Sequence, residues 1–251
     1  MPKVISIHSY RGGTGKSNFT ANLSTAIAQA GHRVGVVDTD IPSPGIHNLF
    51  CLEPEQVTNT LNTYLWGEAE IVDAAYEVSA NVGLQGDGKL FLVPSSTNAD
   101  DIARILQEGY DVKLLNDGLR KLVRGMELDY LLIDTHPGLS KETFLSIAIS
   151  HVLALILRPD KQDYQGTAVT VDVARQLKVK DMILIINKAH SKLDPIALKQ
   201  KVQETYHVPV AGVFPLSEDM AQLASEGVFC TKHLEHPISQ EFQQVAQRLM
   251  A

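Results

Sequence analysis

Short apolar runs alternate along this chain with longer segments in which apolar residues recur at helical spacing. The first run begins at Val4 and ends at a glycine-rich stretch, after which Phe19, Leu23 and Ile27 recur as on one face of a helix. A second run, 34–37, is apolar without alternation, which is typical of a strand buried on both faces. The opening of the chain therefore predicts a strand, a loop, a helix that stops near Gly31, and a second strand.

The same alternation continues to the end of the chain. Further strands are predicted at 90–93, 131–133, 152–157, 182–186 and 208–213. Helical patterns lie near 99–108, 112–125, 141–149, 164–177, 194–206, 217–226 and 238–250. Strands that alternate with helices predict an α/β fold, in which a mostly parallel twisted sheet carries helices on both faces.

Three segments depart from this alternation. Residues 41–57 are rich in proline and are the least regular part, and the glycines of residues 81–89 predict a hairpin or an exposed turn. The apolar side chains of residues 58–76 could belong to the core or to a contact surface, and the core is the favoured interpretation. Because no segment has the composition of a linker, we expect residues 1–251 to form a single domain.

Composition places the chain among ordinary globular proteins, with 44% hydrophobic and 20% charged residues. Lys and Arg number 22 against 29 Asp and Glu, and the net charge of -7 argues against a protein that coats nucleic acid with its whole surface. The two cysteines, Cys51 and Cys230, form no CxxC motif, so we expect a reducing, cytoplasmic location. We expect no signal peptide, because the N-terminal apolar run is short and is broken by His8, and no transmembrane segment, because no apolar run reaches about 18 residues.

A glycine-rich loop with a lysine and a serine stands directly after the first strand and opens the first helix. Its glycines let backbone N–H groups curve around phosphate oxygens, and the helix N-terminus adds positive partial charge. Lys16 supplies a full charge, and the Ser17 hydroxyl can ligate magnesium. A plain turn is the alternative, but the Gly-Lys-Ser spacing between a strand and a helix favours phosphate binding. The predicted binding residues here are Gly12, Gly13, Thr14, Gly15, Lys16, Ser17 and Asn18.

Acidic residues end two of the predicted strands. Asp38 and Asp40 follow the second strand, and Asp134 follows the strand at 131–133. Because the carboxyl ends of parallel strands face one crevice, we expect these acids to lie beside the phosphate loop, where they can handle magnesium and water. A solvated pair of loop acids is the alternative for Asp38 and Asp40. His136 is a less favoured candidate for a general base, because phosphoryl transfer depends mostly on positioning and charge.

These motifs resemble those of the MinD and ParA family of ATPases, whose deviant Walker A loop reads K-G-G-x-x-K followed by Ser or Thr. The resemblance spans nearly the whole chain and implies that Ser17 and Asp134 hold magnesium, with Asp38 near the metal. It also implies that Asp40 contacts the attacking water. Arg11 stands where the family has a signature lysine that reaches the partner subunit's nucleotide, and an arginine keeps that charge but is bulkier.

Two further motifs fit the same resemblance. The segment Asp134-Thr135-His136-Pro137-Gly138 resembles the family's Walker B motif, D-x-P-x-G, and residues 135–139 are the candidate switch. In the family, an asparagine at the place of Asn187 binds adenine, and a loop at the place of Pro215 lines the base. An amide both donates and accepts, which suits an adenine edge, whereas a strand-end turn is the alternative role for Asn187.

The resemblance implies a slow ATPase that uses ATP and magnesium, forms an ATP-dependent homodimer and responds to an unidentified activator or cargo-adaptor protein. Its role would be the positioning or partitioning of a cellular cargo, or the regulation of cell division. A nucleotide-dependent binding scaffold with little turnover is the alternative. It is favoured because Arg11 replaces the signature lysine and because Gly45 stands where MinD-like members have an asparagine. An iron-sulfur carrier like Mrp is suggested by the Pro-Ser stretch after Asp40 but lacks a CxxC motif. A small-molecule kinase would need an acceptor-binding insertion, and none stands out.

Two surfaces bear on possible partners. The last predicted helix, 238–250, has an apolar stripe and a single basic residue, so we expect it to pack on the domain and not to bind a membrane. Between residues 172 and 207, seven Lys or Arg stand against four Asp or Glu. This local excess is a weak indication of nonspecific DNA binding, and a solvated helix surface explains it better.

Overall fold

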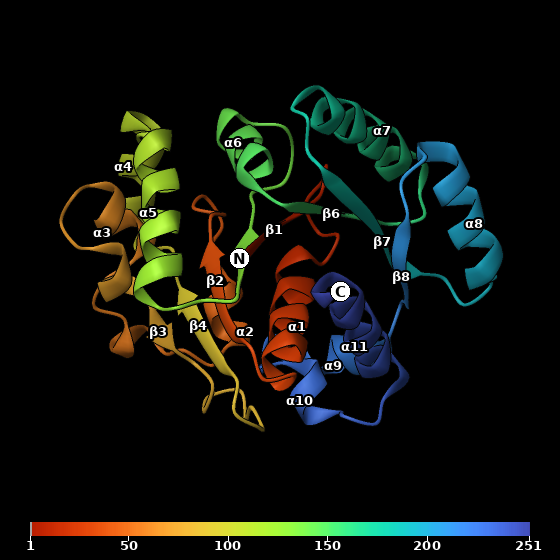
Figure 1. The fold of residues 1–251 in the computed structure, drawn as a ribbon, viewed down its shortest axis with the longest axis horizontal. Helices are drawn as coiled ribbons and strands as arrows, with labels where there is room; N and C mark the ends of the chain where they lie inside the picture. The colour runs from red at the N-terminus through yellow and green to blue at the C-terminus, as the bar shows by residue number, and fades with distance from the viewer. Residues whose placement is uncertain (1) are drawn as a thin grey trace.

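All eight strands belong to one twisted sheet in the order β3-β4-β2-β5-β1-β6-β7-β8 (Figure 1). The computed structural model describes residues 2–251, and at residues 141, 142 and 145 it describes the backbone alone. The strands are β1 Lys3–His8, β2 Arg33–Asp38, β3 Tyr76–Glu77, β4 Lys89–Val93, β5 Tyr130–Asp134, β6 Val152–Leu157, β7 Asp181–Ala189 and β8 Val210–Pro215. Neighbouring strands pair in parallel, except that the short β3 runs antiparallel to β4.

Helices cover both faces of the sheet, as the alternating pattern predicts. They are α1 Lys16–Gln29, α2 Ile46–Leu49, α3 Leu61–Leu65, α4 Ala99–Glu108, α5 Val112–Gly125, α6 Lys141–Ile149, α7 Lys161–Gln176, α8 Pro195–Tyr206, α9 Glu218–Leu223, α10 Phe229–Lys232 and α11 Pro237–Met250. Two 3-10 turns, Pro54–Gln56 and Ile71–Ala74, complete the elements. Within residues 2–251, no helix is both long and apolar enough to cross a membrane.

The core is divided by the sheet. On one face, α1 and α11 pack together over the middle strands, and Phe19, Phe214 and Phe242 meet there with ring centroids 4.5–5.5 Å apart. On the other face, one cluster lies between α3, α5 and the strands β2, β4 and β5, and another lies between α7, α8 and the strands β6 to β8. Because β1 is flanked by β5 and β6, the loop after it leaves the middle of the sheet.

Most predicted elements are present, and the differences occur where the local signal is weak. The two-residue strand β3 and the four-residue helices α2 and α10 are too short for periodicity to reveal. The last strand runs from Val210 to Pro215 and not from 208 to 213, and α9 stops at Leu223 because Ala224 adopts a positive φ of 49°. Residues 81–89 form the expected turn, which leads into β4 from its antiparallel neighbour β3.

Two predictions about packing are confirmed. The segment 58–76 contributes to the core, where Leu61 and Leu65 are buried. The C-terminal helix α11 buries its apolar stripe against α1 and β8, and Phe242, Val245 and Leu249 are each at most 3% exposed. A helix whose apolar side is covered by its own domain has no such face left for a lipid surface.

Candidate functional site

The predicted phosphate-binding loop lies between β1 and α1, at the carboxyl edge of the sheet. Gly13 and Gly15 have φ values of 75° and 94°, a left-handed region that glycine enters without a steric penalty. Gly15 is also closely packed, because a Cβ there would lie 2.6 Å from Nδ2 of Asn187. At Gly13 a Cβ would meet nothing within 4 Å, so the space beside this part of the loop is open.

Asp38 and Asp134 stand side by side at the ends of β2 and β5, where the strand register pairs them directly. Both are buried, with exposures of 1% and 0%. Burial raises the pKa of Asp38 well above its usual value, and repulsion from Asp134 raises it further. Burial also raises the pKa of Asp134, although the nearby Lys16 and a hydrogen bond from Ser17 oppose the rise.

These residues fit a magnesium ion. Oδ1 of Asp134 accepts a hydrogen bond from Thr20 at 3.1 Å, whereas its Oδ2 is buried and has no hydrogen-bond partner among the described residues. A carboxylate oxygen left without a partner is costly unless a cation takes its place. The neighbouring Asp38 carboxylate and the Ser17 hydroxyl supply further oxygen atoms, which are the donors that magnesium prefers.

Asp40 lies between two nitrogen-bearing side chains. Its Oδ2 is 3.9 Å from Nζ of Lys16, and its Oδ1 is 2.6 Å from Nδ1 of His136. Its backbone N–H donates to Oδ1 of Asp38 at 3.0 Å, which joins the two acids in one network. The structure thus brings Lys16, Asp38, Asp40 and Asp134 close together, as the sequence predicts, and it adds His136 to them.

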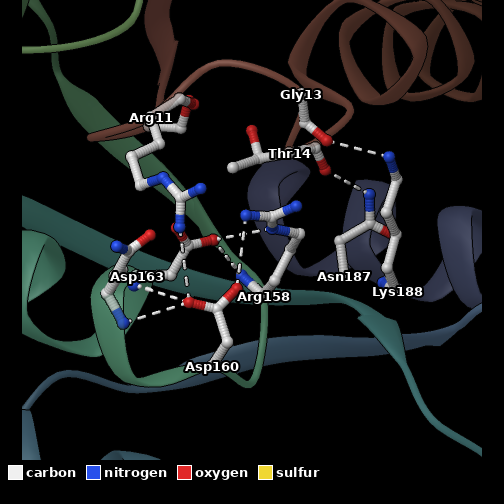
Figure 2. A network of polar contacts seen from close by, with 10 residues as sticks. Arg11, Gly13, Thr14, Arg158, Asp160, Asp163, Asn187 and Lys188 are labelled. Atoms are coloured by element: carbon white, nitrogen blue, oxygen red, sulfur yellow. Dashed lines mark hydrogen bonds and ion pairs between the residues drawn. The ribbon is translucent and has the colours of Figure 1, made fainter.

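The side chain of Arg11 points toward Asp160 and Asp163 at the start of α7 (Figure 2). Its Nη1 is 3.5 Å from Oδ1 of Asp160 and 3.4 Å from Oδ1 of Asp163. Arg158 binds the other oxygens of the same carboxylates, with its Nε 3.1 Å from Asp163 and its Nη2 3.2 Å from Asp160. The sequence analysis missed Arg158, Asp160 and Asp163, because it placed the start of this helix at residue 164, whereas α7 begins at Lys161. Oδ1 of Asp160 does cap α7, accepting from the backbone N–H groups of Gln162 and Asp163.

A cavity of about 270 Å³ opens beside the loop, between the N-terminal end of α1 and the ends of β7 and β8. Asn187 and Pro215, the predicted base-binding residues, both line it, as does Asn18. The amide of Asn187 is bonded within the protein, because its Nδ2 donates to the Thr14 carbonyl at 2.8 Å and its Oδ1 accepts from the backbone of Lys188 (Figure 2). Contact of Asn187 with adenine therefore stays a prediction.

Lys188 is a further loop contact that the sequence analysis did not single out. Its Nζ donates to the carbonyl of Gly13 at 2.8 Å, and its own backbone has a positive φ of 55°. Together with Asn187 it ties the end of β7 to the phosphate-binding loop. No signal in the sequence distinguishes Lys188 from the other exposed lysines, because the contact depends on the irregular strand register between Ile186 and Ala189 near the end of β7.

Comparison with known proteins identifies the family. Residues 1–250 match the family model described as ParA, NUBPL iron-transfer P-loop NTPase. An uncharacterized ATP-binding protein of Methanocaldococcus jannaschii is 26% identical over 251 residues, which cover 100% of this chain and 88% of the relative. An iron-sulfur cluster carrier protein of Saccharolobus solfataricus is 26% identical over 98% of this chain and 82% of its own length.

The fold is also shared with a solved structure. The septum site-determining protein MinD of Pyrococcus horikoshii, complexed with Mg-ADP, superposes with a TM-score of 0.81 over 99% of this chain and 96% of that one. At 22% sequence identity this likeness concerns the fold, and it confirms the predicted parallel α/β architecture.

Proposed function

This chain belongs to the ParA family of P-loop NTPases, and we propose that it is a magnesium-dependent ATPase that works as a slow dimeric switch. The observation that carries the proposal is the buried Oδ2 of Asp134, which has no partner among the described residues and lies beside a phosphate-loop lysine and serine. A protein that merely used a glycine-rich turn would have no need to bury two neighbouring carboxylates there.

The proposed roles follow from the positions of the side chains. The glycine backbone and Lys16 bind the terminal phosphates, while Ser17, Asp134 and Asp38 hold the magnesium ion, which would neutralise phosphate charge. Asp40 accepts a hydrogen bond from the attacking water and so orients it. Asn18, Asn187 and Pro215 lie around the cavity that would take the base.

Arg11 is proposed to act across a dimer interface. In this chain its partners are the carboxylates of Asp160 and Asp163 at the start of α7, so it does not occupy its own phosphate site. When Arg11 leaves, Arg158 still pairs with both Asp160 and Asp163, and neither acid loses its last cation. An interface cation that can be released in this way makes assembly depend on the phosphate of the partner subunit's nucleotide. Hydrolysis would then undo the dimer.

Calorimetry and a phosphate-release assay test the proposal. We expect the wild-type protein to bind ATP in the presence of magnesium and to release phosphate slowly, and we expect Lys16→Ala to abolish binding. The exposed Lys192 provides a matched control, and Lys192→Ala should bind ATP like the wild type. Equal binding by Lys16→Ala, or no uptake of ATP by the folded wild type, would remove the basis of the proposal.

Iron-sulfur carriage is the second candidate, favoured by the family description and by the Saccharolobus relative. A cluster needs accessible thiolates, whereas Cys230 is 2% exposed and burial raises its pKa to about 12. Cys51 is half-buried and supplies one thiol per chain. This chemistry favours the ATPase switch. Anaerobic reconstitution that gave one cluster per dimer, and lost it in Cys51→Ser, would instead support the carrier.

A further inference from the structure

His136 makes a short hydrogen bond to the carboxylate that the proposed function assigns to the attacking water. The distance from its Nδ1 to Oδ1 of Asp40 is 2.6 Å. A carboxylate oxygen can only accept, so the ring donates and Nδ1 carries the hydrogen. The contact is therefore a directed, charge-assisted bond, which is short and strong compared with a neutral one.

This bond persists when the other partner of Asp40 is drawn away. Nζ of Lys16 lies 3.9 Å from Oδ2 of Asp40, which is beyond hydrogen-bond distance. A terminal phosphate in the loop attracts Lys16, so the lysine cannot at the same time hold the carboxylate in one orientation. The imidazole then remains as the side chain that fixes Asp40.

The backbone on either side of His136 is anchored. The hydroxyl of Thr135 donates to the carbonyl of Ile7 at 2.9 Å, and the N–H of Gly138 donates to the carbonyl of Ser9 at 3.0 Å. Both anchors belong to β1 and the start of the phosphate-binding loop. The ring is thus carried on a segment tied to the same loop that would hold the nucleotide, which is what precise orientation requires.

The family motif does not provide this contact. In D-x-P-x-G the third place is a proline, which has no side-chain donor, and in this chain that place is His136. We propose that His136 is a positioning residue, whose Nδ1–H holds the Asp40 carboxylate toward the attacking water. The inference rests on the proposed ATPase function and adds to it a residue on which the rate, and not nucleotide affinity, depends.

Steady-state kinetics of three variants test the inference. His136→Leu removes the donor and should lower kcat roughly 10- to 100-fold, because misplacing a reacting group by about 1 Å costs that much. The KM for ATP should change less than about twofold, because the loop and Lys16 are untouched. His136→Asn places an amide N–H near the position of Nδ1 and should restore most of kcat, whereas the longer His136→Gln should not.

His32 offers a matched control at the opposite end of the sheet. Its Nδ1 lies 3.6 Å from Oδ2 of Asp129, and its side chain is 36% exposed against 41% for His136. His32→Leu should therefore leave kcat unchanged. Long-range proton-nitrogen NMR of the wild type should also show His136 with its hydrogen on Nδ1, and Asp40→Ala should shift that signal.

The outcomes separate the inference from the function beneath it. A folded wild type that releases no phosphate overturns both. An active wild type whose His136→Leu variant keeps its kcat, or whose His136→Asn variant is as slow as His136→Leu, overturns the positioning role alone. A hydrogen found on Nε2 in place of Nδ1 also overturns it. A low kcat in His136→Leu and His136→Gln, with recovery in His136→Asn, supports the positioning role.

Discussion

Asp160→Asn should strengthen ATP-dependent dimerisation by releasing Arg11. The asparagine oxygen can still accept from the backbone of Gln162 and Asp163, so the cap of α7 is kept, while one negative charge is removed. Arg11 and Arg158 then share Asp163 alone, and Arg158 has the shorter contact to it, 3.1 Å against 3.4 Å. The variant therefore shifts Arg11 toward the free orientation that a partner subunit would need.

The size of this effect follows from exposure. The side chains of Arg11 and Asp160 are 35% and 43% exposed, and pairs of this kind are worth about 0.5–1 kcal/mol. A dimer frees two Arg11 side chains, so the two contributions add to about 1–2 kcal/mol. We therefore expect the dimer dissociation constant to fall roughly 5- to 30-fold.

Sedimentation velocity with magnesium and a non-hydrolysable ATP analogue measures the constant directly. Asp172→Asn is the control, because Asp172 pairs with Arg175 at 3.6 Å on the same helix, away from the loop. Arg11→Ala should cancel the gain in the double variant. A dissociation constant that is unchanged or higher in Asp160→Asn would refute the reasoning that the α7 carboxylates restrain Arg11.

Three further predictions concern the site and its support. Asp134→Asn should raise the melting temperature without magnesium, because it removes the repulsion between Asp134 and the neighbouring buried carboxylate of Asp38. The same variant should lose magnesium-dependent ATP binding, and calorimetry that still shows such binding would contradict the assigned role. Burial lowers the pKa of His8 to about 3, so the unfolded chain takes up a proton near pH 6.5 that the folded chain refuses. The free energy of unfolding in urea should therefore fall as the pH drops below about 6.5, by about 2 kcal/mol at pH 5. His8→Gln should flatten this pH dependence. An equal pH dependence in the wild type and the variant would contradict the prediction. Gly15→Ala should abolish ATP binding, because its Cβ would lie 2.6 Å from Nδ2 of Asn187 and displace the loop. Gly31→Ala has the same φ of 94° but no atom within 4 Å of its Cβ, so it should bind ATP normally; equal affinities of the two variants would show that the close contact at Gly15 does not matter.

Sequence reasoning works best here where a site is contiguous or follows from topology. The phosphate loop could be predicted because its residues are consecutive and lie between a strand and a helix. The convergence of Asp38 with Asp134 could be predicted because parallel strands end at one edge, and the register places the two opposite each other.

Contacts that depend on the exact path of a loop could not be predicted in the same way. The partner of Arg11 at Asp160 lies 149 positions away, and its local signal indicates a helix cap and no ion pair. The sequence analysis could consider His136 only as a general base, since nothing in the sequence shows that its ring contacts Asp40, which lies 96 positions away. In both cases the sequence analysis identified Arg11 or His136 as a candidate, but the partner of the side chain is visible only in the folded structure.

Lys16 and Arg11, the two cations assigned to phosphate, have similar surroundings. These surroundings explain how a nucleotide moves both side chains with a small loss of free energy. Lys16 faces Asp40, and Arg11 faces Asp163, so each cation has a carboxylate near it without nucleotide. Each carboxylate also has a second donor, because His136 binds Asp40 and Arg158 binds Asp163. A buried acid that loses its last partner costs several kcal/mol, whereas an acid that keeps one loses far less. A phosphate can therefore attract Lys16 and Arg11 without leaving Asp40 or Asp163 unpaired. The free energy of nucleotide binding is then not used up by an unpaired acid and remains available for dimer assembly.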